Sequence, residues 1–335
     1  MSEAAKRGAE NVVRRCLAVQ PGERVVLLSW RAAGLVGWLE SACVDAGAVP
    51  VVIATDAHAS ASDVGRWVDR ALEGATASVL LAEHGVPPPL SMAVLDAAKR
   101  KSLRHLHLTR ADQRLFEQSY RAEPQRIAEL NERVRAVLTA ATELRARGDN
   151  GTDLRVGLSR AFPLLSAEGQ PRPGHADNLP SGFVFFHPGS VEGTITADRG
   201  LLGAIRIGRD RLRAPVTFHV ENGRLRELRC EDAALRAEIE GYLASHVHAP
   251  RVGLVSLPTN YVVRTESGLD VQDALLPGLG LSLGYTDHES TKAPFACPVQ
   301  LRILSRKLDV TAGPRVLVRA GRLESDLVRD VDPFR

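Results

Sequence analysis

The sequence lacks a long apolar run and carries little excess charge. The formal net charge of its 335 residues is +3, and Arg and Lys are interspersed with Asp and Glu. A charge this small gives no indication of a nucleic-acid partner. No apolar run approaches the roughly 20 residues that a membrane-spanning helix needs. We therefore expect neither a nucleic-acid partner nor a membrane partner.

The sequence also lacks paired cysteines and a signal-peptide core. Its four cysteines lie far apart and without CxxC spacing, at Cys16, Cys43, Cys230 and Cys297. This pattern predicts reduced, mostly buried thiols and no structural zinc site. Residues 1–15 are polar and charged, without the apolar stretch of a secretion signal. A cytoplasmic protein is the expectation.

In the first 150 residues, short apolar runs alternate with helical patterns. Strands are predicted at residues 24–30, 49–54, 77–82 and 103–108, and helices at residues 4–19, 32–46, 64–72, 90–101 and 124–147. Buried strands that alternate with helices are typical of an open parallel sheet covered on both faces. The turn residues Gly148-Asp149-Asn150-Gly151 end the last helix. We place a domain boundary there, between an N-terminal α/β domain (1–150) and a second domain (151–335).

The second half is richer in glycine and has few helical patterns. Strands are predicted at residues 154–158, 203–207, 216–220, 299–304 and 315–318, and one helix at 232–248. Asn222-Gly223 predicts a hairpin turn, because both residues accept a positive φ. The expected class is α/β plus α+β, with a β-rich second domain.

Ordered segments of the second half resemble motifs of the M29 metallopeptidases, the aminopeptidase T family. Residues 178–185 (NLPSGFVF) resemble its N-[LMF]-P-[SD]-G-E-V-F motif, and residues 251–260 resemble R-x-G-E-x-x-x-G-x-N. Residues 277–284 resemble G-T-x-H-x-A-L-G. The resemblance covers nearly the whole chain. It implies a peptidase-like fold and a dimer, formed by two copies or with an M29-like relative.

The M29 family holds two divalent ions with Glu, Glu, His, His and Asp, and a Tyr lies nearby. In this sequence the five ligand positions fall on residues without a ligating side chain, which are Phe183, Leu254, Gly280, Ala296 and Pro298. The Tyr position falls on Asp287, with Tyr285 two residues earlier. No side chain is left to offset the desolvation of a divalent ion. We expect no metal and no cofactor.

A related branch, the dihydroxypyridine dioxygenases, keeps an iron site of two His and one carboxylate. This sequence lacks those His positions as well, which argues against an iron oxygenase.

Several polar residues remain as candidates for acid–base chemistry. His187 and the run Asp287-His288-Glu289 are candidate catalytic residues if the protein is an enzyme. The alternatives are a hydrogen-bonded structural histidine and a solvated loop. Cys297 is interpreted as a small buried thiol rather than a nucleophile.

Two histidine pairs have alternative interpretations. His105 and His107 alternate on a predicted strand and face one side, so they are either a metal pair or part of a packed sheet face. We favour packing, because no third ligand is evident. His246 and His248 are interpreted as cationic caps at a helix end.

The resemblance, together with the lost ligands, predicts a metal-free protein that binds a precursor or cyclised peptide in a former aminopeptidase cleft. The candidate ligand-binding residues are Phe183, Leu254, Gly280, Tyr285, Ala296 and Pro298. Peptidase-like proteins of this kind occur in ribosomal peptide natural-product pathways, including the crocagin type. The alternative is a metal-independent enzyme that cyclises or isomerises a peptide. A residual aminopeptidase is the weaker alternative.

Overall fold

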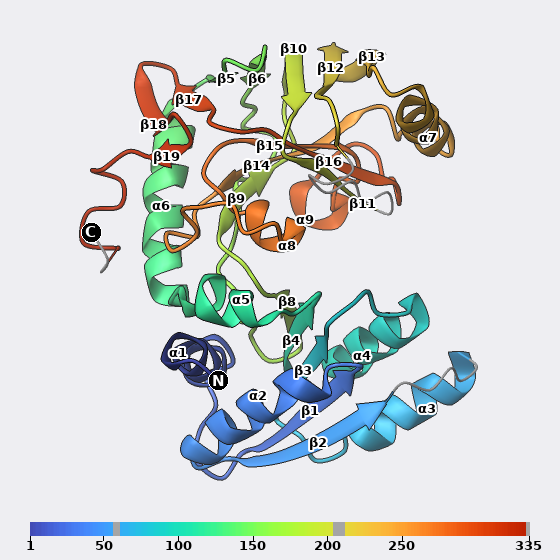
Figure 1. Cartoon of the computed structure of the whole chain (residues 1–335), viewed down its shortest axis with the longest axis vertical. Helices are drawn as coiled ribbons and strands as arrows, with labels where there is room; N and C mark the ends of the chain where they lie inside the picture. Colours follow the sequence, from blue (N-terminus) through green and yellow to red (C-terminus); the bar gives the residue numbers. More distant parts are fainter. Residues whose placement is uncertain (56–60, 204–211, 333–335) are drawn as a thin grey trace. The chain divides into compact units, whose positions relative to one another are not determined.

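The computed structural model describes residues 1–55, 61–203 and 212–332, and the chain divides into two compact units (Figure 1). Unit 1 consists of Met1–Arg126 and Ala167–Ser181, and unit 2 consists of Ile127–Ser166 and Gly182–Arg335. We expected a single boundary at residue 150. Instead, the chain enters unit 2 within a helix and returns once to unit 1.

Unit 1 is built on a parallel sheet in the order β2-β1-β3-β4-β8. Its strands are β1 (Arg24–Trp30), β2 (Val49–Thr55), β3 (Ala77–Ala82), β4 (Arg104–Thr109) and β8 (His175–Asn178). The first four agree with the predicted strands. The last comes from the returning segment, where His175 pairs with Arg104. This pairing explains why residues 167–181 belong to unit 1.

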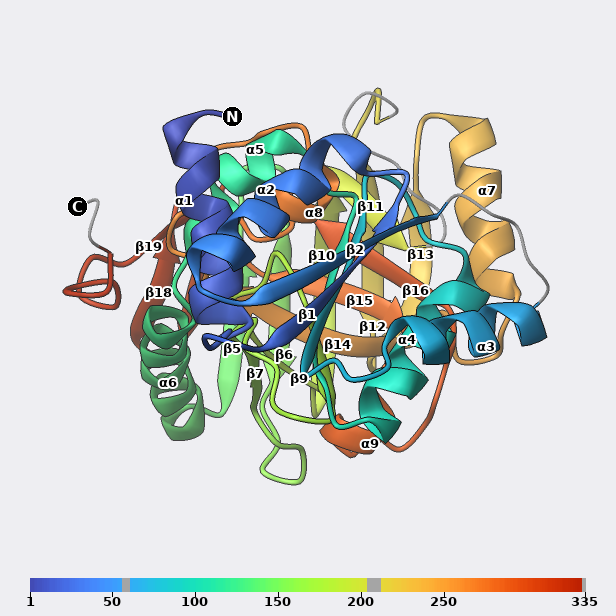
Figure 2. The ribbon, with the colours of Figure 1, turned by 90° about the horizontal axis from the view of Figure 1, so that it is seen from below.

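The helices of unit 1 pack beside this sheet (Figure 2). They are α1 (Glu3–Asn11), α2 (Ala33–Asp45), α3 (Ala61–Ala71), α4 (Pro88–Arg100) and α5 (Gln113–Glu117). Helices α3 and α4 cover the sheet face that bears Val26, Leu28 and Leu80. The helix predicted at residues 4–19 is shorter than expected, because a π-helical turn at Val12–Cys16 follows α1.

Unit 2 contains two sheets whose described pairings are antiparallel. The larger has the order β13-β12-β10-β6-β5-β17-β18-β19, and the smaller has the order β11-β16-β15-β14-β9-β7. The strands of the larger sheet are β5 (Glu143–Arg147), β6 (Asp153–Gly157), β10 (Ser190–Ala197), β12 (Val216–Glu221), β13 (Arg224–Arg229), β17 (Asp309–Ala312), β18 (Arg315–Arg319) and β19 (Arg322–Leu323). Those of the smaller sheet are β7 (Leu165–Ala167), β9 (Phe183–Phe186), β11 (Gly200–Gly203), β14 (Val252–Pro258), β15 (Gly280–Gly284) and β16 (Gln300–Leu304).

The helix predicted at residues 124–147 is partly wrong. Helix α6 (Pro124–Ala140) is shorter than predicted, and β5 follows it. Leu144 and Ala146 are buried and alternate with more exposed neighbours, which is the period of a strand. Strand β5 pairs with both β6 and β17, so tertiary pairing overrides the local helical pattern.

Other expectations differ in smaller ways. The helix predicted at residues 232–248 is α7 (Ala233–Ala244), which ends four residues earlier than predicted. The strand predicted at residues 203–207 lies almost wholly outside the described residues. The remaining short helices are α8 (Asp270–Asp273), α9 (His288–Thr291) and a 3-10 turn at Ser119–Arg121. The predicted hairpin is confirmed, since Asn222 and Gly223 join β12 to β13 with φ of 51° and 66°. No described helix is long and apolar enough to cross a membrane.

Candidate functional site

The candidate site lies on one face of the smaller sheet in unit 2. Strands β9, β14, β15 and β16 pair side by side. Because side chains alternate across a strand, one face carries a fully buried apolar set, which comprises Val184, Phe186, Val255, Leu257, Leu281, Leu283, Leu301 and Ile303. The other face carries the half-buried Phe183, Phe185, Leu254 and Arg302, and we call it the open face because these side chains are less buried than those of the first face. Three of the six predicted ligand-binding positions, Phe183, Leu254 and Gly280, lie on it.

Phe183 fills space beside the sheet with hydrocarbon. Its side chain packs against Val263, Leu275 and Leu276, and its ring centroid lies 5.6 Å from that of Phe185. An aromatic side chain in this environment supplies no donor for a metal ion. The side chain of Phe183 is therefore surrounded by apolar packing.

Gly280 is required by its neighbours rather than by its backbone angles. A Cβ atom built at this position would lie 2.7 Å from Ser256 Oγ and 2.9 Å from Arg302 Nε. Any larger side chain, including the histidine that the M29 resemblance assigns here, needs the space that the guanidinium fills. Arg302 is thus a site residue that the sequence interpretation missed, since no motif singled it out.

Arg302 reaches across the open face from β16. Its Cα pairs with Ser282, but its Nη2 donates to Ser256 Oγ at 3.1 Å and to the carbonyl oxygen of Ala274 at 3.2 Å. Its Nε is buried without a hydrogen-bond partner among the described residues. Burial lowers the pKa of Arg302 to about 10, so the group stays charged at neutral pH.

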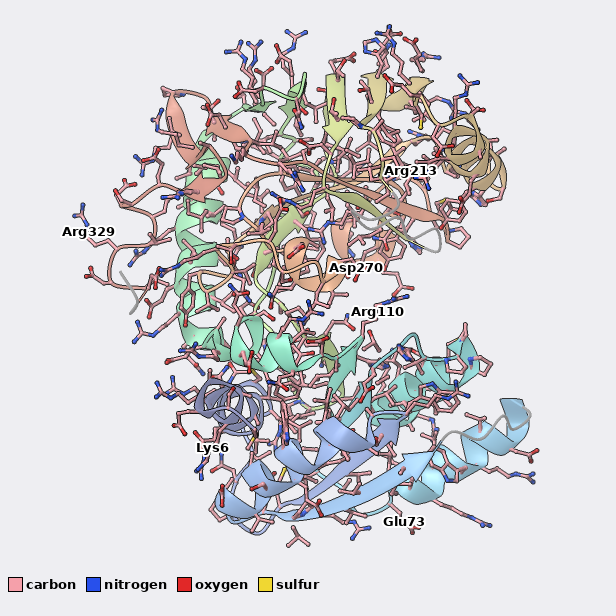
Figure 3. All side chains as sticks on the ribbon, viewed as in Figure 1. Lys6, Glu73, Arg110, Arg213, Asp270 and Arg329 are labelled. Carbon is pink, nitrogen blue, oxygen red and sulfur yellow. The ribbon has the colours of Figure 1, made fainter. Side chains whose placement is uncertain are left out.

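Two further arginines lie near the same segment. Arg199 donates to the carbonyl oxygen of Asp273 at 3.5 Å, and it shares Glu266 with Arg306 at distances of 3.6 and 2.9 Å. Figure 3 labels Asp270 at the start of α8, the short helix that ends beside these groups. Arg199 and Arg306 are therefore paired with a carboxylate, whereas no described ion pair involves Arg302.

The other predicted ligand-binding residues lie toward the opposite end of the sheet. Tyr285 follows Gly284, which pairs with Gln300, whereas Gly280 pairs with Ser256. Gly280 and Gly284 are four residues apart on β15, roughly 13 Å at strand spacing. Ala296 and Pro298 are exposed and lie outside the strands. The described residues thus do not gather all six positions into one cluster.

His187 is held in an aromatic environment just after β9. Its Nδ1 lies 2.8 Å from the carbonyl oxygen of Gly253, and its ring centroid lies 4.6 Å from Phe162 and 5.7 Å from Phe295. Burial lowers the pKa of His187, so the imidazole is neutral at pH 7. The contact with Gly253 favours a proton on Nδ1 and leaves Nε2 as a base.

The other acid–base candidates lie on a short helix with much solvent contact. Asp287 precedes α9 with φ of 46°, and His288 and Glu289 are exposed. None of the described hydrogen bonds or ion pairs joins them to His187. Burial, followed by the charge of Asp287, raises the pKa of Tyr285.

The interpretation of His246 as a helix cap is wrong, because α7 ends before it. Its Nδ1 lies 3.3 Å from the Cys297 Sγ and accepts a hydrogen bond from the backbone N–H of His248. Cys297 itself is buried, as expected. Residues 51 positions apart form this contact, so the linear sequence gave no signal for it.

His105 and His107 share a buried sheet face in unit 1, as the alternation predicts. His105 Nδ1 contacts Ser78 Oγ at 2.8 Å, His105 Nε2 contacts His107 Nδ1 at 3.1 Å, and His107 Nε2 contacts Ser91 Oγ at 3.3 Å. Each ring nitrogen is therefore used in a hydrogen bond. The packing role is the one that these contacts support.

The described residues do not fit a metal centre. No group of three or more His, Cys, Asp or Glu within them is placed to hold an ion. Phe183, Leu254 and Gly280 carry a phenyl ring, an isobutyl group and a hydrogen atom. The guanidinium of Arg302 lies beside Gly280. A permanent cation at this place opposes the binding of a divalent ion.

Unit 2 also has a cavity of about 250 Å³, and one of its lining residues, Val263, packs against Phe183. It is lined by Asn260, Tyr261, Val263, Arg264, Thr265, Pro277, Gly321, Arg322, Leu323, Val328 and Asp332. Within it, Arg264 forms an ion pair with Asp332, whose side chain is buried. The cavity wall is therefore largely neutralised by its own residues.

Two solved structures match the chain over nearly their full lengths. The 2,5-dihydroxypyridine dioxygenase from Pseudomonas putida KT2440 matches with a TM-score of 0.68 and 18% identity, covering 97% of this chain and 98% of that one. The wild-type AmpT from Thermus thermophilus matches with a TM-score of 0.67 and 18% identity, covering 96% and 98%. At this identity the likeness shows the fold, which is M29-like as predicted.

A family comparison adds a second finding. No curated protein matches the chain. The model of the family described as NicX, 2,5-dihydroxypyridine 5,6-dioxygenase, matches residues 8–250, which is more than half of the sequence. The match ends before Leu254, Gly280 and Arg302. The chain belongs to the NicX (2,5-dihydroxypyridine 5,6-dioxygenase) family.

Proposed function

We propose that this protein is a metal-independent member of its family that binds a peptide on the open face of the smaller sheet. The observation that carries the proposal is the contact between Gly280 and Arg302, in which a guanidinium fills the place that a ligating histidine would need. Phe183 and Leu254 add apolar surface beside it. The site is thereby suited to holding a ligand rather than an ion.

Membership of a dioxygenase family makes an iron reaction the first function to weigh. Such a reaction needs donors such as two His and one carboxylate. The described residues offer no such group, and the family match does not extend to β14, β15 and β16. Both facts support a change of function within the family.

A peptide is the proposed ligand for two reasons. The resemblance to aminopeptidases implies an ancestral site for an extended chain. The open face presents half-buried Phe183, Phe185 and Leu254, which suit the apolar side chains of such a chain. We further propose a precursor or cyclised peptide of a natural-product pathway as the ligand, and a dimer as the working form.

Metal content and ligand binding test the proposal together. Purified protein is analysed for metals, and binding of apolar tetrapeptides is measured by calorimetry with and without EDTA. We expect less than one metal ion per chain and equal affinity in both conditions.

The variant Leu254→Asp should weaken binding at least tenfold. The matched control Leu95→Asp changes an exposed leucine in unit 1 and should leave binding unchanged. Stoichiometric iron with EDTA-sensitive consumption of 2,5-dihydroxypyridine would sink the proposal.

Proton-transfer catalysis by His187 is a second candidate function. The observation that favours it is the contact of Nδ1 with Gly253, together with the lowered pKa, which make Nε2 a neutral base. In this alternative, His187 and the cluster of Asp287, His288 and Glu289 would cyclise or isomerise a peptide. Turnover that disappears in His187→Gln but persists in His175→Gln, an exposed histidine of unit 1, would support it. Binding without turnover would leave the first function. Assays with added cobalt or zinc test a residual aminopeptidase.

A further inference from the structure

We infer that Arg302 anchors a carboxylate group of the ligand. This inference rests on the proposed binding function and names the chemistry of the ligand at that site. It concerns a residue outside the family match and outside the motifs of the M29 resemblance.

The first step is that, among the described residues, no carboxylate forms an ion pair with Arg302. Its Nη2 donates only to neutral acceptors, the hydroxyl of Ser256 and the carbonyl group of Ala274. By contrast, its neighbours Arg199 and Arg306 share Glu266.

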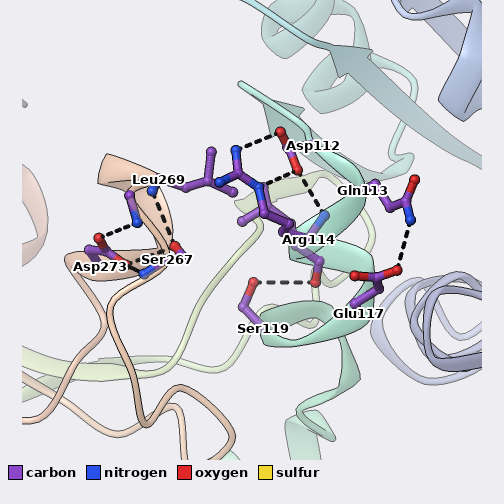
Figure 4. A network of polar contacts seen from close by, with 10 residues as sticks. Asp112, Gln113, Arg114, Glu117, Ser119, Ser267, Leu269 and Asp273 are labelled. Carbon is purple, nitrogen blue, oxygen red and sulfur yellow. Dashed lines mark hydrogen bonds and ion pairs between the residues drawn. The ribbon is translucent and has the colours of Figure 1, made fainter.

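The second step is that the carboxylate of Asp273, the residue before Ala274, is already engaged by other donors. The Asp273 carboxylate accepts hydrogen bonds from the backbone N–H and hydroxyl of Ser267, both at 2.8 Å, and from the N–H of Gly268 at 3.0 Å. Figure 4 shows this network, in which Leu269 also donates to Ser267. Asp273 therefore caps its own loop and does not turn toward Arg302.

The third step is energetic. A charge that is partly removed from water and has no counter-charge is destabilising, and a carboxylate that pairs with it offsets part of that cost. Arg is the side chain best suited to this role, because its planar group can bind a carboxylate through two parallel hydrogen bonds. Nη1 makes no hydrogen bond with a described residue, and Nε is unpaired. The guanidinium thus has donors left for a ligand.

The fourth step concerns the body of the ligand. Ser256 pairs with Gly280 on one side and with Phe185 on the other, so the guanidinium contacts a residue that lies next to an aromatic side chain. Leu254 lies two residues along the same strand and on the same face. The ligand that fits is a carboxylate attached to an apolar group. A peptide with an apolar C-terminal residue has this chemistry, and so does a small aromatic acid.

Three probes separate these sources in the full-length protein. They are N-acetyl-leucyl-phenylalanine, its C-terminal amide and benzoate, and binding is measured by ligand-observed NMR. The variants are Arg302→Gln and Arg302→Lys, with Arg306→Gln as the matched control. We expect the acid to bind at least tenfold more tightly than the amide, Arg302→Gln to lose this preference, Arg302→Lys to retain part of it, and Arg306→Gln to keep it.

Thermal unfolding of Arg302→Met without ligand is a second readout. Removal of the unpaired charge offsets the loss of its hydrogen bonds to Ser256 and Ala274, so we expect an unchanged Tm. A purely structural arginine would give a lower Tm.

The outcomes distinguish the two proposals. Equal binding of acid and amide, unchanged in Arg302→Gln, overturns the carboxylate anchor and leaves peptide binding in place. Arg302-dependent binding of benzoate alone supports the anchor and contradicts a peptide ligand. Binding of none of the three probes overturns the anchor.

Discussion

A Cβ atom at position 280 would lie 2.9 Å from the Nε of Arg302, so the arginine in its present position leaves room only for a glycine there. The pair spans two neighbouring strands of the smaller sheet and reaches the hydroxyl of Ser256 on a third. The pair includes position 280, where the M29 resemblance assigns a metal-binding histidine. The consequences of this contact are open to direct measurement.

The variant Gly280→Ala should destabilise the protein by about 1–3 kcal/mol, because the methyl group overpacks against Ser256 and Arg302. Denaturant unfolding measures the loss. Gly241→Ala is the control, since a Cβ there meets nothing within 4 Å in helix α7 and alanine should stabilise that helix by roughly 0.5–1 kcal/mol.

The double variant Gly280→Ala/Arg302→Ala completes the test. If the clash with Arg302 causes the loss, the effect of the alanine at 280 should shrink when the guanidinium is absent. Additive effects would show that another neighbour is responsible.

Much of this arrangement was predictable from sequence, but the packing of the Arg302 side chain against Gly280 was not. Local apolar runs predicted β1, β2, β3 and β4 closely, because a buried parallel strand is marked by its own residues. The M29 resemblance predicted that Phe183 and Leu254 replace metal ligands. Arg302 belongs to no motif, and only the register of β15 with β16 brings it to Gly280.

Tertiary pairing also explains the failed helix at residues 143–147. Leu144 continues the helical spacing of α6, but residues 143–147 lie between β6 and β17 and form a strand. Likewise, His246 was interpreted as a helix cap from its place in the sequence. Its contact with Cys297 depends on two segments that no local pattern joins.

The buried pair His105 and His107 predicts a loss of stability in mild acid. Burial lowers the pKa of His107 to about 4 and lowers that of His105 well below its usual value, with the nearby His107 adding to the effect. The unfolded chain binds protons near pH 6.5 and the folded chain does not. The contribution of these neutral rings to the free energy of unfolding is therefore fully present above pH 6.5 and declines as the pH falls toward 4.

For His107 alone, the free energy of unfolding should fall by about 2 kcal/mol between pH 7 and pH 5. Urea unfolding at both pH values measures this change. His107→Gln should flatten the pH dependence, whereas His288→Gln, which alters an exposed histidine, should not. A wild-type protein equally stable at both pH values would contradict the prediction.

Asn11 joins α1 to the turn after α5 within unit 1. Its side-chain amide donates to the carbonyl oxygens of Tyr120 at 2.7 Å and Ala122 at 2.8 Å. Asn11→Leu leaves both buried acceptors unpaired and should cost about 2–4 kcal/mol of stability. Gln113→Leu, which removes an exposed hydrogen bond to Glu117, should change stability by less than about 0.5 kcal/mol in the same denaturant titration.

The four free cysteines should differ sharply in their reactivity. Burial raises the pKa of the Cys43 thiol to about 12 and raises that of Cys16 further, so neither forms thiolate at pH 8. Cys230 is half-buried, and its Sγ donates only to the carbonyl oxygen of Asp232 at 3.3 Å. We expect iodoacetamide to label Cys230 first in the native protein, as read by peptide mass spectrometry. Cys230→Ser should remove the fast phase, and unfolding in urea should expose all four thiols. Rapid native labelling of Cys16 would contradict the burial that places it in the core of unit 1.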